Sequence, residues 1–101
     1  MGILRIVKMD FQSSMVQEFD ELFDHVEPKI LEQPGCLKVM LLKSTANPLE
    51  RTTLSWWEDE ASLLSYRSSA LFGEVWPRTK AKFQNAPIAW SLEWDLEGMT
   101  L

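Results

Sequence analysis

Two segments of this chain carry apolar side chains on both of the faces that a β-strand presents. The first segment, residues 3–11 (ILRIVKMDF), places Ile3, Val7 and Met9 on one face and Leu4 and Ile6 on the other. The second, residues 36–43 (CLKVMLLK), places Leu37, Val39 and Leu41 on one face and Cys36, Met40 and Leu42 on the other. A sheet face with so many apolar side chains forms a large exposed patch if nothing covers it. We therefore expect helices to cover one face of the sheet and a second copy of the chain to cover the other.

A helix is predicted between these two strands. Apolar residues recur there at spacings of three and four, at Val16, Phe19, Phe23, Val26 and Ile30. Ser14 and Gln17 have the spacing of a capping box, which predicts the start of the helix. Pro28 lacks an N–H group and crowds the preceding turn, so we expect a kink or a break there. Pro34 and Gly35 predict the end of the helical segment.

The second half of the chain repeats this order of elements. Residues 51–57 (RTTLSWW) are rich in Thr and Trp and predict a strand. Asp59 is the predicted N-cap of a second helical region that runs to about Phe83. Gly73 and Trp76-Pro77 predict an interruption of that region, residues 84–87 (QNAP) a turn, and residues 88–96 (IAWSLEWDL) a fourth strand.

The element order predicts an α+β fold. Two successive βαβ units are typical of the ferredoxin-like βαββαβ arrangement, in which an antiparallel sheet carries its helices on one face. The length of 101 residues corresponds to a single domain, residues 1–101, with one hydrophobic core. Together with the second copy on the open sheet face, this predicts a homodimer that packs sheet to sheet; the family resemblance described below implies that such a dimer is an α/β barrel.

Charge and composition exclude several function classes. The net charge of −5 disfavours binding to nucleic acid, because such a surface repels phosphate backbones. No apolar run approaches the roughly 20 residues that a bilayer requires, so we expect no membrane partner. A single cysteine, Cys36, cannot form an internal disulfide and fits a cytoplasmic protein.

The residue types that usually carry chemistry are scarce. One His and one Cys give transition metals few ligands, so no metal site is predicted. Histidine is the residue type most often used as a general base at neutral pH, so His25 is a candidate, although a lone His beside Glu21 and Asp24 is also typical of a surface ion pair. The run DELFDHVE indicates a solvated helical face, and Cys36 a buried structural thiol.

The aromatic residues divide into two groups. Trp56, Trp57, Trp90 and Trp94 lie in predicted strands, where packing in the core is their expected role. Tyr66, Arg67 and Trp76 lie in the second helical region and are candidates for a site. For Arg67 the alternative is a solvent-facing guanidinium on a buried stem.

The whole chain resembles a small member of the antibiotic biosynthesis monooxygenase superfamily. The resemblance rests on four segments in order: ILRIVKMDF, VEPKILEQPGC, SWWEDEASL and SYRSSALFGEVWPRTKAKF. It implies a ferredoxin-like fold that dimerises through its sheets. It also implies oxidation of polycyclic phenols, quinols or haem, which several members carry out without metal or flavin because the substrate itself reduces oxygen.

The resemblance argues against opening of the haem ring. Members with that activity use an Asn on the first strand, a Trp on the second helix and a His further along it. The corresponding positions here carry Val7, Tyr66 and Trp76, with Phe72 completing the family's aromatic spacing. All three functional residues are therefore replaced.

These observations predict a monooxygenase-like homodimer that needs no cofactor. Each subunit is expected to have an apolar pocket between helices and sheet, for a small apolar, aromatic or quinol-type molecule. The expected lining is Phe23, Tyr66, Phe72 and Trp76, together with Val7; Arg5 or Arg67 would hold an anion, and His25 and Arg67 are the catalytic candidates. Two alternatives stay open: a non-catalytic module that binds or senses a small molecule, and a purely structural dimer with a filled core.

Overall fold

The computed structural model describes residues 1–95. Seven elements follow one another along the chain: β1 (Gly2–Phe11), α1 (Val16–Leu31), β2 (Cys36–Lys43), β3 (Glu50–Trp57), α2 (Glu60–Arg67), α3 (Ala70–Lys80) and β4 (Phe83–Trp94). The strands form one sheet in the order β2-β3-β1-β4, and each neighbouring pair is antiparallel. The ferredoxin-like α+β fold is thus confirmed, with the second helical region divided in two.

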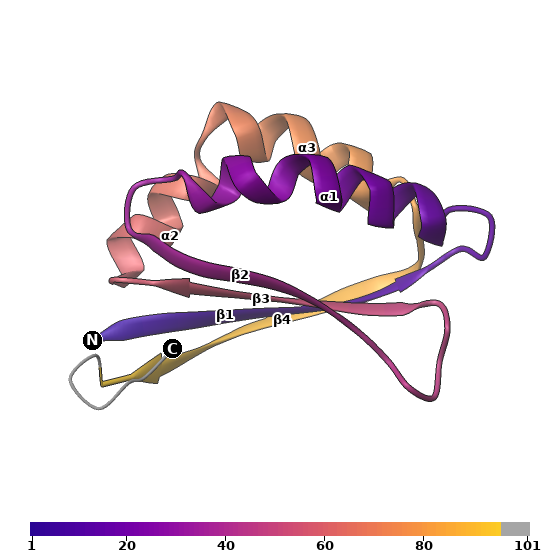
Figure 1. Ribbon diagram of the computed structural model, residues 1–101, viewed down its shortest axis with the longest axis horizontal. Helices are drawn as coiled ribbons and strands as arrows, with labels where there is room; N and C mark the ends of the chain where they lie inside the picture. Colours follow the sequence, from indigo (N-terminus) through magenta and orange to yellow (C-terminus); the bar gives the residue numbers. More distant parts are fainter. Residues whose placement is uncertain (96–101) are drawn as a thin grey trace.

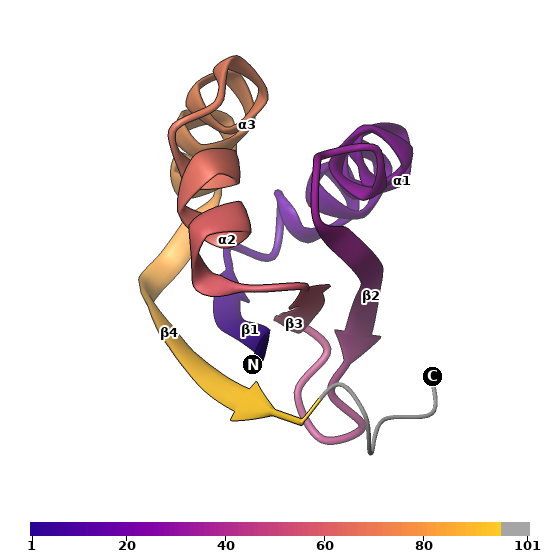
Figure 2. The same cartoon turned by 90° about the vertical axis from the view of Figure 1, so that its left-hand side faces the viewer.

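The helices lie on one side of the sheet. Figure 1 shows α1 and α3 side by side above the strands, with α2 joining the end of β3 to α3. The view in Figure 2 shows that no helix lies on the opposite face. None of the helices in residues 1–95 has the length and apolar character needed to span a membrane.

Helix α1 differs from its predicted form at two places. The predicted capping box at Ser14 is wrong, because the N-cap is Met15, whose side chain makes no capping hydrogen bond. The backbone carbonyl of Gln12 instead accepts from Val16 N at 3.1 Å. The break at Pro28 is also wrong, since the helix continues to Leu31. Pro28 is exposed, so water can reach the carbonyl that its missing N–H leaves without a partner.

The division between α2 and α3 falls earlier than predicted. Asp59 caps α2 as expected, and its carboxylate accepts from Ser62 N at 2.8 Å. Ser69 then caps α3 by accepting from Phe72 N at 3.2 Å. A new helix therefore starts at the Ser69 cap. Gly73 and Pro77, the predicted points of interruption, lie inside α3.

Strand β4 is longer at its start than predicted. Residues 84–87 are part of the strand and not a turn. Since β4 is an edge strand, Pro87 removes no ladder bond that a further strand would need. Register shifts between Lys8 and Phe11 of β1 accommodate this extension. The last residue of the predicted strand, Leu96, lies outside the described residues.

A β-bulge changes the face of one residue in β2. The register against β3 shifts between Cys36 and Lys38, so that Cys36 pairs with Trp57 and Lys38 with Trp56. Cys36 therefore shares the helix-facing side with Trp57 and packs against the core. Its prediction on the opposite face from Val39 is wrong, because strict alternation does not anticipate a bulge.

The core lies between the helices and the sheet. The buried apolar side chains come from β1, α1, β2, β3 and α2: Ile3, Met9, Phe11, Phe19, Leu22, Phe23, Val26, Ile30, Val39, Trp57 and Leu63. Trp57 and Phe11 are fully buried at opposite ends of the sheet. These two large rings close the ends of the space that the helices cover.

The outer face of the sheet is apolar as well. Paired positions on this face are Leu4 with Trp56 and Leu92, Ile6 with Leu54 and Trp90, and Met40 with Leu54. On β4, Ile88, Trp90 and Leu92 are 59%, 40% and 51% exposed. Apolar side chains, predicted on both faces of the first two strands, thus lie on both faces of the sheet.

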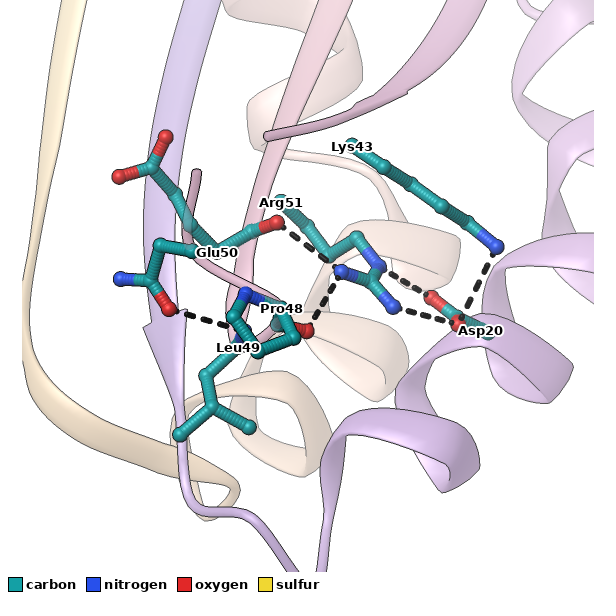
Figure 3. A network of polar contacts seen from close by, with 7 residues as sticks. Asp20, Lys43, Pro48, Leu49, Glu50 and Arg51 are labelled. Atoms are coloured by element: carbon teal, nitrogen blue, oxygen red, sulfur yellow. Dashed lines mark hydrogen bonds and ion pairs between the residues drawn. The ribbon is translucent and has the colours of Figure 1, made fainter. Parts of the chain in front are cut away.

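One buried cation ties α1 to the sheet (Figure 3). Arg51 of β3 is 7% exposed, and its Nε and Nη2 donate to the two carboxylate oxygens of Asp20 at 2.9 and 3.0 Å. Its Nη1 donates to the backbone carbonyls of Pro48 and Glu50, both at 3.0 Å. Asp20 thus belongs to a structural ion pair and not to the solvated helical face that its sequence context indicates.

Removing the carboxylate should strongly destabilise the fold. We expect Asp20→Asn to lower the free energy of unfolding by about 3 kcal/mol, because the Arg51 charge stays buried without its partner. The matched control is Lys43→Ala: Lys43 is 3.8 Å from the same carboxylate but is 63% exposed, so we expect a loss below about 1 kcal/mol. Urea unfolding measures both, and equal losses would show that burial of Arg51 does not matter.

Candidate functional site

A cavity of about 200 Å³ lies between the helices and the sheet. Strands β1, β2, β3 and β4 form its floor, and α1, α2 and α3 form its walls. It is lined by seven of the side chains that the sequence predicts for the site: Arg5, Val7, Phe23, Tyr66, Arg67, Phe72 and Trp76. The structure therefore brings together residues from β1, α1, α2 and α3.

The cavity exists because the middle of the sheet presents small side chains to the helices. Val7 pairs with Thr53 of β3 and with Ala89 of β4, and all three line the cavity. The adjoining floor position pairs Arg5 with Ser55. Close packing would normally fill such a gap, so its persistence between the fully buried ends of the sheet indicates space for a ligand.

His25 lies elsewhere. It is exposed on α1 and does not line the cavity. Instead it borders a second, polar depression between α1 and the end of α3, with Glu18, Glu21, Arg78 and Lys82. The catalytic role predicted for His25 stays a prediction, and nothing in the cavity's geometry brings it near a bound molecule.

Eight aromatic rings form a continuous chain along the site. From the β3 end they are Trp57, Tyr66, Phe72, Trp76, Phe83, Phe11, Phe19 and Phe23, with neighbouring ring centres 4.3–6.1 Å apart. Five of these rings line the cavity: Phe19, Phe23, Tyr66, Phe72 and Trp76. Such edge and stacked contacts are favourable beyond the burial of area, and they hold the rings in fixed positions.

Tyr66 supplies the polar group of this aromatic wall. Its ring stacks on Trp57 at 5.1 Å and meets Phe72 edge-on at 5.3 Å. Burial, and secondarily the nearby Cys36, raise the pKa of Tyr66 to about 12. At neutral pH its hydroxyl is therefore a neutral hydrogen-bond donor, and it makes no hydrogen bond within residues 1–95.

Two arginines form the polar side of the cavity. Arg5 donates from Nη1 to Ser91 Oγ at 3.2 Å, while Arg67 is the last residue of α2. Burial lowers the pKa of Arg5, and the positive charge of Arg67 lowers it further. In the part of the chain that the structure describes, no Asp or Glu lines the cavity.

Sequence reasoning missed the hydroxyl groups of the site. Ser55 accepts from Trp57 Nε1 at 2.9 Å, which leaves its own proton free to donate toward the cavity. Thr53 is on the same strand face, whereas the buried Thr79 of α3 donates to the Val75 carbonyl at 3.0 Å. Polar residues at alternate positions of β3, Arg51, Thr53 and Ser55, were the available indication.

Cys36 and the carboxylates do not form a reactive centre. Burial raises the pKa of the Cys36 thiol to about 11, so the thiol is neutral and a poor nucleophile at neutral pH. Within residues 1–95, His, Cys, Asp and Glu do not gather in groups of three that could hold a metal ion. The chemistry of the cavity therefore depends on arginine, tyrosine and serine side chains.

Comparison with known families identifies the chain. The model of the antibiotic biosynthesis monooxygenase family matches residues 2–76. The chain belongs to this family. The match includes Arg5, Val7, Phe23, Tyr66 and the other cavity residues up to Trp76, whereas Thr79, Pro87 and Ala89 of the lining follow the matched segment.

Solved structures show the same fold. A conserved protein from Methanosarcina mazei Go1 is 24% identical, with a TM-score of 0.88 and 93% of each chain covered. A protein from Mycobacterium tuberculosis is 13% identical, with a TM-score of 0.88, covering 98% of this chain and 100% of the other. A structure described as an antibiotic biosynthesis monooxygenase is 16% identical, with a TM-score of 0.84, covering 92% and 98%. At these identities the likeness concerns the fold alone, and a comparison with curated protein sequences finds no match.

The ionisation of Tyr66 offers a direct test of its environment, since it is the only tyrosine in the chain. We expect tyrosinate absorbance to appear only near pH 12, and not near the ordinary value of 10. The unfolded chain releases this proton first, so the free energy of unfolding should fall as the pH rises from about 10 to 12. Tyr66→Phe should remove both the absorbance and this part of the pH dependence; ionisation at the ordinary pKa would place the ring in solvent.

Proposed function

We propose that the protein is a monooxygenase that oxidises a small electron-rich aromatic molecule, such as a phenol or quinol, without a bound cofactor. The observation that carries this proposal is the cavity of about 200 Å³ with its aromatic wall. An engineered apolar cavity of about 150 Å³ holds benzene, so this volume suits one substituted ring. A flavin or haem has several fused rings and is too large to share the space with a substrate.

The chemistry balances without a further reductant. A phenol and O₂ give a quinone and water: one oxygen atom replaces a ring hydrogen and becomes the second carbonyl, and the other leaves as water. The substrate supplies all four electrons that reduce O₂. Because the phenolate is far more easily oxidised than the phenol, the protein's task is to stabilise the anion and to exclude bulk water.

The residues of the cavity fit this task. The positive charges of Arg5 and Arg67 would lower the pKa of a bound phenol, so that water can accept its proton without a dedicated base. The Tyr66 hydroxyl can donate to an oxygen of the substrate. Phe23, Phe72 and Trp76 would hold the ring and keep the site apolar.

Haem-ring opening is not part of this proposal. Val7, Tyr66 and Trp76 stand where haem-opening relatives are expected to carry Asn, Trp and His. Trp76 lines the cavity but has no lone pair with which to bind iron, and no His of the described chain lies there. Haem could enter only as an apolar ligand.

One observation favours a second function, namely binding or sensing of the small molecule without turnover. The described lining contains no His, Asp or Glu, the groups that act most often as general bases. The proposed oxidation avoids this requirement only if the arginines lower the substrate's pKa far enough. Oxygen consumption therefore separates the two functions.

The proposed assembly is a homodimer through the outer sheet face. Leu4, Ile6, Leu54, Trp90 and Leu92 form a contiguous apolar surface there, with no helix over it. Face-to-face packing of two such sheets buries the surface of both copies and forms the barrel.

Oxygen uptake tests the proposed reaction. With a one-ring quinol as substrate, we expect consumption of one O₂ per molecule oxidised. Tyr66→Phe should lower the rate by roughly tenfold or more, because a donor to the developing charge is lost. Its melting temperature should stay nearly unchanged, since the hydroxyl makes no hydrogen bond within residues 1–95.

The control for that variant is His25→Gln on the exposed face of α1. We expect its rate to equal that of the unmodified protein. A loss of rate in His25→Gln with none in Tyr66→Phe would move the chemistry away from the cavity, and no oxygen uptake with any phenol or quinol would favour the binding function.

The mass in solution tests the dimer. Light scattering at micromolar concentration should give about twice the chain mass of 11.7 kDa. Leu92→Glu, on the outer face and 51% exposed, should give monomers because it places a charge in the interface. Leu64→Glu, at an equally exposed position on α2, should leave the dimer intact. A monomeric unmodified protein would contradict the proposed assembly.

A further inference from the structure

We propose that Arg5 and Arg67 together bind a carboxylate of the substrate, so that the substrate class is a single-ring aromatic acid. This inference rests on the proposed function of the cavity and adds the group by which the molecule is recognised. It is carried by two guanidinium groups that have no carboxylate partner within residues 1–95 and that line the same apolar cavity from opposite layers of the fold.

The two arginines reach the cavity from different elements of the fold. Arg5 lies on the floor, on β1, between Ser55 of β3 and Ser91 of β4 in the sheet register. Arg67 lies at the C-terminal end of α2, directly after Tyr66. The guanidinium groups are close enough for the charge of Arg67 to lower the pKa of Arg5.

Within the described residues, no carboxylate forms an ion pair with either arginine. The ion pairs among residues 1–95 join Lys8 to Glu50, Lys43 to Asp20 and Arg51 to Asp20, and none of them includes Arg5 or Arg67. In the described part of the chain, the Arg5 side chain has one hydrogen-bond partner, the neutral Ser91 hydroxyl at 3.2 Å.

Arg5 and Arg67 lack a carboxylate partner within residues 1–95 although the chain is acidic. Asp and Glu number 15 against 10 Lys and Arg, so carboxylates are abundant. Arg51 shows what this chain does with a buried guanidinium, which is to saturate it with a carboxylate and two carbonyls. Two neighbouring arginines repel each other unless an anion lies between them. A carboxylate of the ligand would neutralise one of the two charges, and the remaining positive charge would still lower the pKa of the substrate phenol.

The form of the cavity selects the rest of the ligand. Apart from the arginines and the hydroxyls of Thr53, Ser55, Tyr66 and Thr79, its lining is apolar, and its volume suits one ring. Guanidinium groups bind the two oxygens of a carboxylate in a paired geometry. With the carboxylate at the arginines, the ring occupies the aromatic part of the cavity beside Phe23, Phe72 and Trp76.

Binding of a matched acid and amide tests this inference without turnover. Phenylacetate and its neutral amide, phenylacetamide, have the same ring and nearly the same shape. Calorimetry under nitrogen at neutral pH should show the acid binding at least tenfold more tightly. Arg67→Gln and Arg5→Gln should each remove most of this preference while leaving the affinity for the amide nearly unchanged.

Arg78→Gln is the matched control, because Arg78 is exposed on α3 and borders the polar depression but not the cavity. We expect it to keep the full preference for the acid. Arg67 is exposed, so its variant should fold even if the half-buried Arg5 proves necessary for stability.

The inference would be overturned if the unmodified protein bound acid and amide with equal affinity, or if it bound neither probe. An equal loss of preference in Arg78→Gln would also overturn it, because that result would indicate only a general attraction of anions. The measurement is independent of oxygen. Failure of the proposed reaction appears as absent oxygen uptake with the acid preference intact, and failure of this inference as oxygen uptake without any preference for the acid.

Discussion

The sheet of this protein is apolar on both faces, and its own helices cover only one of them. On the covered face, the ring of Trp57 at one end and that of Phe11 at the other are fully buried. On the outer face, Trp90 and Leu92 of β4 remain substantially exposed. The covered face forms the core and the cavity. The outer face is available to a second copy of the chain.

The cavity is a consequence of side-chain size along the strands. Large rings stand at the ends of the covered face, while Val7, Thr53 and Ala89 cross its middle. Helix α1 is held at its place above this floor by the bond between Asp20 and the buried Arg51. A helix held in this way cannot collapse freely onto the small residues, so the space beneath it persists as a site.

The fold could be predicted from the sequence because it depends on repeated patterns. Period-two and period-3.6 hydrophobicity gave the strands and helices, and β2 was predicted with the bounds Cys36–Lys43 that it has. The errors arose where a single local contact decides the outcome. The bulge at Cys36, the serine cap at Ser69 and the passage of α1 through Pro28 each depend on one neighbouring residue or on solvent exposure.

The site was predictable in part. Phe23, Tyr66, Phe72, Trp76 and the two arginines line one cavity, and their roles in binding or catalysis stay predictions. The exposure of His25 agrees with the solvated helical face that the run DELFDHVE indicates, because the apolar stripe of α1 fixes which face turns to the sheet. Ser55 was missed because its role depends on the cross-strand pairing with Arg5, which no local pattern contains.

The central claim of this account is that the space between helices and sheet is an open apolar site and not packed interior. Crystals of the protein held under xenon pressure test it most directly, because xenon enters apolar cavities of about 150 Å³ and larger. We predict a xenon atom against Phe23, Tyr66 and Trp76, inside the aromatic wall, with the surrounding side chains unmoved. A structure without xenon there, in which those rings fill the space above Val7 and Thr53, would contradict the account.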